Sequence, residues 1–227
     1  MAKLRKGVKK PAAVAAGRDR AAMLPVPPLQ ARTRERVHAM LAEAERMIAA
    51  GGVAALSLPQ LAERLGVPRA GVYRHFPSAE ALLLALAEQY LAQREQLIPA
   101  AWGRTRSWHT GLRRLVHAAA AYYADRPAAR AVLLHWGMSP EVAAAQRATI
   151  DRLGRTIRQL FESRAGVPEL PREPDPYIIA VEIVTALFAL SERRHRQIRP
   201  DYVAEACRAA EAYLQARLPR QPDRVAG

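Results

Sequence analysis

The sequence predicts an all-α protein with about nine helices. Two observations support this fold class. From Thr33 onward, apolar residues recur almost everywhere at the i, i+3, i+4, i+7 spacing of an amphipathic helix. The alternating pattern of strands and the paired turn dipeptides of hairpins are scarce. Glycines and prolines divide the helical pattern into separate elements.

The first helix is expected over residues 34–50. Thr33 is a suitable N-cap, and Gly51 and Gly52 end the helix. We expect its apolar stripe to face a core. That stripe consists of Val37, Met40, Leu41, Ala44, Met47 and Ile48.

The second helix is expected to begin at Ser57 and to end at Gly66. Ser57 and Gln60 fit a capping box, in which the serine hydroxyl accepts from the amide of Gln60 and the glutamine reaches back. Pro59 lies in the first turn, where its missing N–H costs little. The inward-facing residues are Leu58, Leu61, Ala62 and Leu65.

A third helix is expected over residues 68–75. Ser78 then caps a fourth helix over 79–98, which carries Glu80 in its first turn and ends at Pro99. Further helices are expected at 107–125, 127–135, 139–164, 175–195 and 200–217, with a surface loop at 168–176.

The net positive charge lies in residues 1–31 and 91–227, with little in residues 32–90. The net charge is +14, and residues 1–31 hold seven basic residues against one acidic residue. All four lysines lie between positions 3 and 10, and every later basic residue is arginine. A basic chain favours nucleic acid or an anionic surface as its partner. A GC-rich coding bias toward arginine on solvated helix faces also accounts for the C-terminal excess.

Composition and periodicity together predict four regions. Residues 1–31 lack helical periodicity and form a disordered basic arm. Residues 32–78 form a helix-turn-helix domain, residues 79–218 a larger helical domain, and residues 219–227 a disordered tail.

Several classes of protein are not expected. The apolar runs fall short of the roughly 20 residues that span a bilayer, and no signal peptide is evident, so we expect a soluble, cytoplasmic protein without membrane contact. A single cysteine, Cys207, excludes an internal disulfide. The six histidines show no metal-site spacing, and no catalytic motif occurs. We therefore expect no enzyme activity, metal or cofactor.

The second and third helices carry the residues that a tight helix-turn-helix requires. Two short helices cross at a steep angle only if a small residue lies at the crossing and a flexible residue makes the turn. Ala62 is the small residue, Gly66 makes the turn and Val72 fills the junction. Pro68 opens the third helix with its preset φ. An ordinary corner of two helices with a solvated basic face remains an alternative.

One face of the third helix is suited to a DNA groove. At 100° per residue, Val72 and Phe76 face the core. The small residues of the opposite face let the backbone approach a major groove, and arginine there can read guanine or hold phosphate. Tyrosine, histidine and the helix N-termini at 57–60 and 68–70 can meet phosphates. The candidate DNA-binding residues are Ser57, Pro68, Arg69, Ala70, Gly71, Tyr73, Arg74 and His75.

These residues carry a family resemblance. The stretch 58–83, and the segment Tyr-Arg-His-Phe-Pro-Ser at 73–78 above all, resembles the DNA-binding domain of TetR/AcrR-family transcriptional regulators. With the first helix, the resemblance covers about residues 33–83. It implies phosphate contacts for Ser57, Tyr73 and His75, and groove contacts for Arg69 through Gly71 and Arg74. Ala79 departs from the family, which often has a phosphate-binding lysine there, so the basic arm is expected to compensate.

The resemblance also implies a C-terminal domain that binds a small-molecule effector and pairs into a homodimer. Aromatic and polar residues there are candidate ligand contacts, although each is also suited to an ordinary core or interface position: Trp102, Trp108, His117, Tyr122, Tyr123, His135, Trp136, Met138, Glu182 and Thr185. They favour an apolar or aromatic effector. The apolar stripes of the last two helices are the candidate dimer interface, with Ile178, Val181, Val184, Phe188, Ala189, Val203, Ala206, Cys207, Ala210 and Leu214.

The expected function is therefore a sequence-specific transcriptional regulator, a repressor released from a palindromic double-stranded operator by its effector. The alternative is a constitutive architectural DNA-binding protein without a ligand response. The ratio of specific to nonspecific affinity at fixed salt distinguishes the two.

Overall fold

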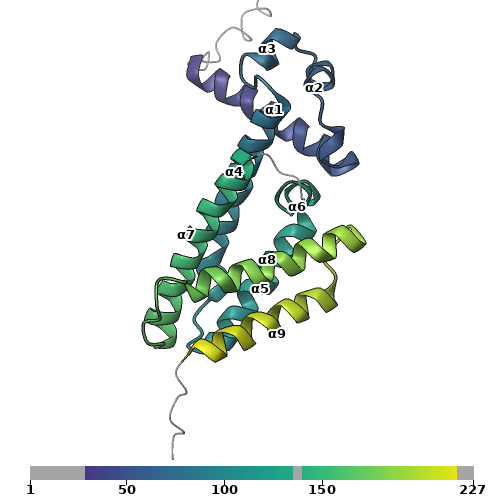
Figure 1. The fold of residues 1–227 in the computed structure, drawn as a ribbon. Coiled ribbons are helices and arrows are strands. Elements are labelled where there is room, and N and C mark those ends of the chain that lie inside the picture. The colour runs from purple at the N-terminus through teal and green to yellow at the C-terminus, as the bar shows by residue number, and fades with distance from the viewer. Residues whose placement is uncertain (1–28, 135–139, 219–227) are drawn as a thin grey trace, which may run out of the picture. The chain divides into compact units, whose positions relative to one another are not determined.

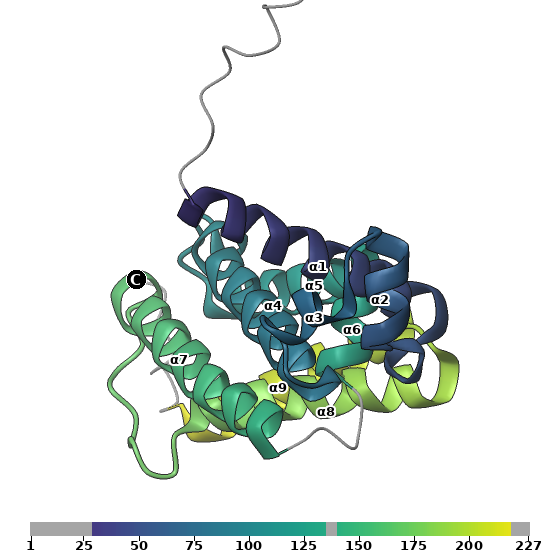
Figure 2. The ribbon, with the colours of Figure 1, turned by 90° about the horizontal axis from the view of Figure 1, so that it is seen from above.

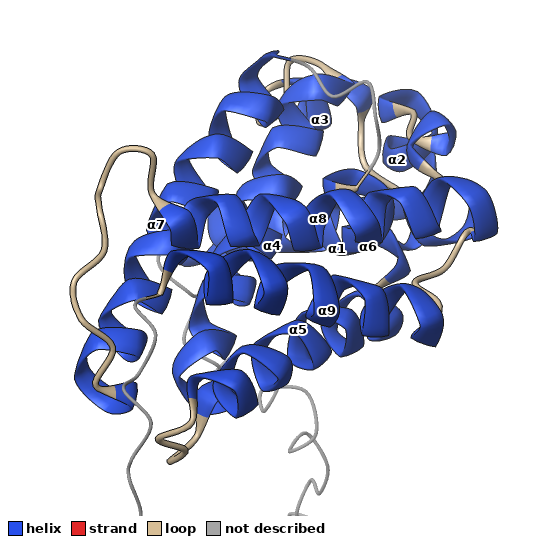
Figure 3. Ribbon diagram, turned by 60° about the horizontal axis from the view of Figure 1, so that its bottom comes forward, coloured by secondary structure: helices blue, strands red, loops and turns tan. Residues whose placement is uncertain are grey.

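The computed structural model describes residues 29–134 and 140–218. Every regular element in these two ranges is a helix (Figure 3), so the predicted all-α class is confirmed. The chain divides into two compact units, residues 1–36 and 37–227. The elements are α1 (Leu29–Gly51), the 3₁₀ turn η1 (Val53–Ala55), α2 (Leu58–Leu65), α3 (Arg69–Tyr73), α4 (Ala79–Trp102), α5 (Trp108–Asp125), α6 (Pro127–Leu133), α7 (Pro140–Ala165), α8 (Pro176–His195) and α9 (Pro200–Arg217).

The start of α1 differs from the prediction. The helix begins at Leu29, so Thr33 lies inside it and is not its N-cap. Residues 29–33 include leucine, glutamine, alanine and arginine, which are good helix formers and extend the helix beyond its apolar stripe. The last three residues of the predicted disordered arm, 29–31, are therefore helical. The rest of that arm and the predicted tail at 219–227 lie outside the described residues.

The end of α4 also differs, because the helix passes Pro99 and continues to Trp102. Packing at the far end explains this. Trp102 is fully buried, and its Nε1 donates to the carbonyl of Thr105 at 3.1 Å. Gly111 on α5 lies so close to the indole that an added Cβ would fall 2.5 Å from it. Tertiary burial thus outweighs the single hydrogen bond that proline removes, and α4 ends at Gly103, whose φ is 67°.

The larger helical region of the second unit is built from pairs of adjacent helices. In Figures 1 and 2, α8 lies beside α9, and α7 lies beside α4. Backbones of α4 and α5, of α5 and α9, and of α7 and α8 also approach closely. These contacts enclose a continuous apolar core that includes Phe161, Tyr177 and Phe188.

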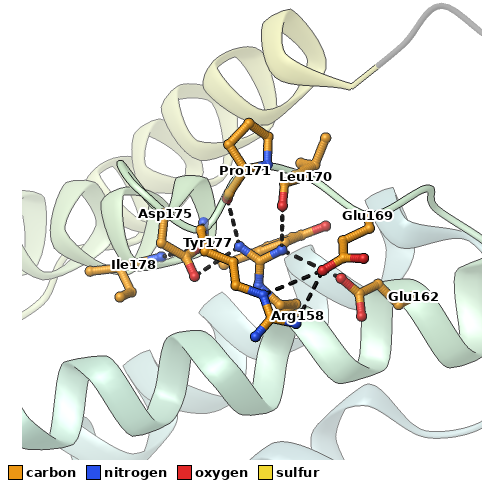
Figure 4. Close-up of polar contacts among 9 residues, drawn as sticks. Arg158, Glu162, Glu169, Leu170, Pro171, Asp175, Tyr177 and Ile178 are labelled. Carbon is orange, nitrogen blue, oxygen red and sulfur yellow. Dashed lines mark hydrogen bonds and ion pairs between the residues drawn. The ribbon is translucent and has the colours of Figure 1, made fainter.

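A buried arginine joins α7 to the start of α8 (Figure 4). Arg158 donates to the carbonyls of Leu170 and Pro171, each at 2.8 Å, and to Asp175 Oδ2 at 2.9 Å. Its guanidinium also lies 5.1 Å from the ring centroid of Tyr177. Burial alone would lower the pKa of Arg158, but its hydrogen bonds and charge interactions with Asp175 and Glu162 raise it. The arginine therefore stays charged and holds the loop that precedes α8.

Candidate nucleic-acid interface and interior cavity

The turn between α2 and α3 has the geometry that its sequence predicts. Gly66 adopts left-handed φ and ψ of 64° and 29°. The amide of Val67 donates to Ala62 O at 3.0 Å, and the amide of Gly66 donates to Glu63 O at 3.1 Å. These two bonds form a Schellman motif, which satisfies the last carbonyls of α2 and redirects the chain. Ala62 and Val72 are buried at the junction, as predicted.

The two faces of α3 are as predicted, although the helix is shorter than the expected 68–75. Val72 is fully buried, and Phe76 is buried just beyond the helix. On the opposite side, Tyr73 is 45% exposed, which makes it one of two exposed large hydrophobic residues in the described chain. The candidate DNA-binding residues divide into exposed Pro68, Arg69, Ala70, Tyr73 and Arg74, and half-buried Ser57, Gly71 and His75.

The arginines of this face are available to an external anion. Within the described residues, neither Arg69 nor Arg74 forms an ion pair, whereas Arg64 on the preceding helix pairs with Glu43 at 3.4 Å. Gly71 has open space around it, since a Cβ added there would meet nothing within 4 Å. The face therefore combines two uncommitted guanidinium groups with a backbone that a groove could approach.

The predicted capping box at Ser57 does not form. Ser57 is the N-cap of α2 by its backbone, with φ −138° and ψ 119°, but its hydroxyl accepts no capping hydrogen bond. Ser78 shows the contrast, because its Oγ accepts from the amide of Ala81 at 3.2 Å. The sequence pattern indicates the helix start correctly but not the side-chain rotamer. The Ser57 hydroxyl is thus left for another acceptor or donor.

A cavity lies within the larger helical region. Its volume is about 80 Å³, several times the ~10–15 Å³ that one water requires. Five helices line it, and the residues are mostly apolar. They are Arg94, Leu97, Ile98, Ala101, Leu112, Leu115, Val116, Ala118, Ala119, Leu153, Ile157, Tyr177, Ala180, Val181, Val184, Thr185 and Leu214.

Of the predicted ligand contacts, Thr185 lines this cavity. His117 and Glu182 are exposed, and Trp108 is half-buried. His135, Trp136 and Met138 lie outside the described residues. Cavity residues that the prediction missed include Arg94, Leu97, Ile98 and Ala101, which share one face of α4 at i, i+3, i+4, i+7 spacing. That spacing was the available signal.

The remaining predicted contacts pack in the core. Trp102 lies against Phe161, with ring centroids 5.2 Å apart. Tyr122 donates its hydroxyl to Gln93 Oε1 at 2.9 Å, and burial raises its pKa to about 12. Burial also raises the pKa of Tyr123, and the charge and hydrogen bonding of the adjacent Arg94 lower it by a smaller amount. Their aromatic clustering therefore accompanies ordinary core packing beside the cavity.

Most residues of the predicted dimer stripe pack against other helices of the same chain. Val181, Val184 and Leu214 line the cavity, while Phe188, Val203, Cys207, Ala210 and Leu214 are buried. The interface predicted between two copies stays a prediction, because an apolar stripe indicates burial but not which element provides it. A second stripe on α8 is left partly exposed and outside the core cluster, namely Ile179, Ile183, Ala186 and Leu190.

An arginine network connects α6 to the corner between α8 and α9. Arg130 Nε lies 2.7 Å from Glu192 Oε2. The other guanidinium nitrogens donate to the carbonyls of Tyr123 and Arg196, each at 3.1 Å. On its other side α6 contacts η1, the turn that precedes α2. The structure thus provides a continuous path of contacts from α8 to the helix-turn-helix.

No group of three or more histidine, cysteine, aspartate or glutamate residues is placed to bind a metal in 29–134 or 140–218. In the same ranges, each helix is too short or too polar to cross a bilayer.

Comparisons with known proteins agree with this arrangement. Residues 40–86 match the family model for bacterial regulatory proteins of the tetR family. Residues 107–214 match the model for a Tetracyclin repressor-like C-terminal domain. Together the two models account for most of the chain. No curated protein matches the sequence.

Solved structures share the fold. A TetR-family transcriptional regulator from Pectobacterium atrosepticum has a TM-score of 0.64 at 22% identity, covering 86% of this chain and 100% of that chain. The fatty acid degradation regulator FadR from Bacillus halodurans has a TM-score of 0.61 at 14% identity, covering 79% and 94%. A TetR-family regulator from Streptomyces coelicolor has a TM-score of 0.61 at 20% identity, covering 81% and 99%. From its two matched domains and its exposed helix-turn-helix, this chain belongs to the TetR family of DNA-binding transcriptional regulators.

Proposed function

We propose that this protein is a homodimeric repressor that binds a palindromic operator and is released from it by an apolar or aromatic effector. The observation that carries the proposal is the solvent-facing side of α3. There, exposed Arg69, Arg74 and Tyr73 surround the uncrowded backbone of Gly71. A face of this kind supports major-groove reading by arginine and phosphate contacts by tyrosine.

Ser57, at the start of α2, and His75, just after α3, are both half-buried. We propose that both contact phosphates and fix the register of the helix on the duplex. The phosphate contact proposed for Ser57 is supported by its hydroxyl, which makes no capping hydrogen bond to an amide of α2. The basic arm is proposed to add phosphate contacts that Ala79 cannot make.

The cavity supports the ligand response. Its walls come from α4, α5, α7, α8 and α9, and five residues separate the end of α3 from the start of α4. An effector that prefers one arrangement of these helices would shift the population between DNA-binding and non-binding states. In a dimer, a small displacement of α4 would change the distance between two recognition helices, which must reach grooves roughly 34 Å apart.

The dimer is proposed to form through the partly exposed stripe of α8, with Ile179, Ile183, Ala186 and Leu190 facing the same stripe of a second copy. Such an interface is isologous, which means that the same stripe of both copies forms the two sides of the contact. In sedimentation, the Ile183→Arg variant should then behave as a monomer. Its helical content should be unchanged.

The test of the function as a whole is footprinting on DNA next to the protein's own gene, followed by a screen of small molecules for release. We expect protection of a palindrome and loss of protection with an apolar or aromatic compound. Uniform protection of unrelated DNA that no compound changes would contradict the proposal and support an architectural role.

A further inference from the structure

The charge of the cavity is confined to one side chain. Of the residues that line it, Arg94 alone is charged, and Tyr177 and Thr185 alone carry hydroxyls. All the other lining residues are aliphatic. A ligand that fills this space therefore meets apolar walls over most of its surface and one fixed positive charge.

Arg94 has no carboxylate partner of its own. Among the described residues it forms no ion pair, and its guanidinium carbon lies 5.2 Å from the ring centroid of Tyr123. The adjacent acid, Glu95, pairs instead with Arg152 on α7 at 3.1 Å. A half-buried guanidinium beside apolar walls gains most from an anion, because charge-assisted hydrogen bonds are strong where water is partly excluded.

Thr185 adds a hydroxyl to the wall of the cavity. The ring of Tyr123, which Arg94 contacts, lies 6.3 Å from the ring of Phe188 on α8. Thr185 precedes Phe188 by three residues, so the two share a face of that helix. The Thr185 side chain is buried and makes no hydrogen bond within the described chain. It can therefore donate to an anion bound in the cavity.

The rest of the cavity wall is apolar. Leu97 is 38% exposed, although it belongs to the cavity wall and is one of the two exposed large hydrophobic residues in the described ranges. It lies one turn along α4 from Arg94. Ile157, Leu153 and Leu214 continue the apolar wall.

We propose that the effector is an amphipathic carboxylate, with its carboxylate bound by Arg94 and Thr185 and its apolar body along the aliphatic walls. This rests on the proposed function, in which the cavity is the effector site, and it adds the chemical class of the effector. A neutral analogue of the same shape loses the charge-assisted bonds, and a cationic analogue is repelled.

The test uses three probes that differ only in their head group: 3-phenylpropanoate, 3-phenylpropan-1-ol and 3-phenylpropylamine, with octanoate and octan-1-ol as an aliphatic pair. Calorimetric titration of the full chain should show the carboxylate binding about tenfold or more tightly than the alcohol, and the amine not binding. Arg94→Gln should remove this preference while leaving the affinity for the alcohol within about twofold.

Arg126→Gln is the matched control. Its guanidinium also lies over a tyrosine ring, 4.6 Å from the centroid of Tyr122, but it does not line the cavity. We expect this variant to keep the wild-type preference. Equal binding of acid and alcohol, loss of preference in Arg126→Gln as well, or binding of no probe would each overturn the proposal.

DNA release, measured separately, distinguishes this inference from the proposed function. If carboxylates bind through Arg94 but do not release DNA, the carboxylate site stands and the ligand-responsive repressor does not. If a neutral compound releases DNA and its binding is unaffected by Arg94→Gln, the repressor stands and the carboxylate site does not.

Discussion

Arg158 and Asp175 form a buried ion pair, with Nη2 2.9 Å from Oδ2, and Asp175 at the same time caps α8. Its Oδ1 accepts from the amides of Tyr177 at 2.8 Å and Ile178 at 3.4 Å. One carboxylate thus satisfies the first turn of α8 and attaches that turn to α7. Because Tyr177 lines the cavity, the pair also positions part of the cavity wall.

Arg158→Ala should therefore destabilise the fold strongly. Removing one partner of a buried pair leaves an uncompensated charge and costs about 3–5 kcal/mol. Urea unfolding measures this loss. Arg172→Ala is the control, since the Arg172 side chain is 81% exposed in its pair with Glu169, and such surface pairs contribute about 0–1 kcal/mol. Similar losses in the two variants would show that Arg158 has no special structural role.

Gly111→Ala should also destabilise the protein. The new methyl group would lie 2.5 Å from the Trp102 ring, which is fully buried and has no room to move. Overpacking of this kind costs about 1–3 kcal/mol. Gly71→Ala is the matched control, because its methyl group meets nothing within 4 Å and alanine is the better helix former. Thermal unfolding should thus show a lower Tm for Gly111→Ala only.

Stability should fall at alkaline pH. Burial raises the pKa of Tyr122 and of Tyr177 to about 12, from the ordinary tyrosine pKa of about 10. Between about pH 10 and pH 12 the unfolded chain releases tyrosine protons that the folded chain retains. The free energy of unfolding therefore decreases as pH rises through this range. Urea unfolding at a series of pH values checks this. A constant free energy of unfolding through this range would contradict the assigned burial of the two hydroxyls.

Tyr73→Ala should weaken DNA binding on all sequences by a similar factor. The exposed Tyr73 hydroxyl is proposed to contact a phosphate, and phosphate contacts carry no base information. Fluorescence anisotropy with several duplexes measures this loss. Tyr202→Ala, on α9 and half-buried, should leave DNA affinity unchanged. A loss confined to one duplex would assign Tyr73 to base reading instead.

Local signals predict the fold well where a helix end depends on its own residues. The Ser78 cap and the left-handed Gly66 were both predicted, since each needs only short-range geometry. The prediction failed at Pro99, where α4 continues because burial of Trp102 by α5 stabilises the last turn. That contact joins distant segments and has no local signature.

The candidate sites also differ in whether local sequence signals predict them. The exposed face of α3 could be predicted, because one short helix with a 3.6-residue period determines which residues point outward. The cavity could not, since five helices line it and aromatic residues such as Tyr123 pack beside it. The spacing of Arg94 with Leu97, Ile98 and Ala101 indicates a shared face of α4, but it does not indicate that this face lines a cavity.

The most direct measurement compares wild type and Arg74→Ala, with Arg69→Ala in parallel, on operator and scrambled duplexes across a salt series. We expect at least one variant to lose about 1–3 kcal/mol of binding free energy on the operator and to relax sequence preference at one base pair. Wild-type affinity that is equal for both duplexes, or unchanged by both substitutions, would contradict the assignment of this face of α3 to operator recognition.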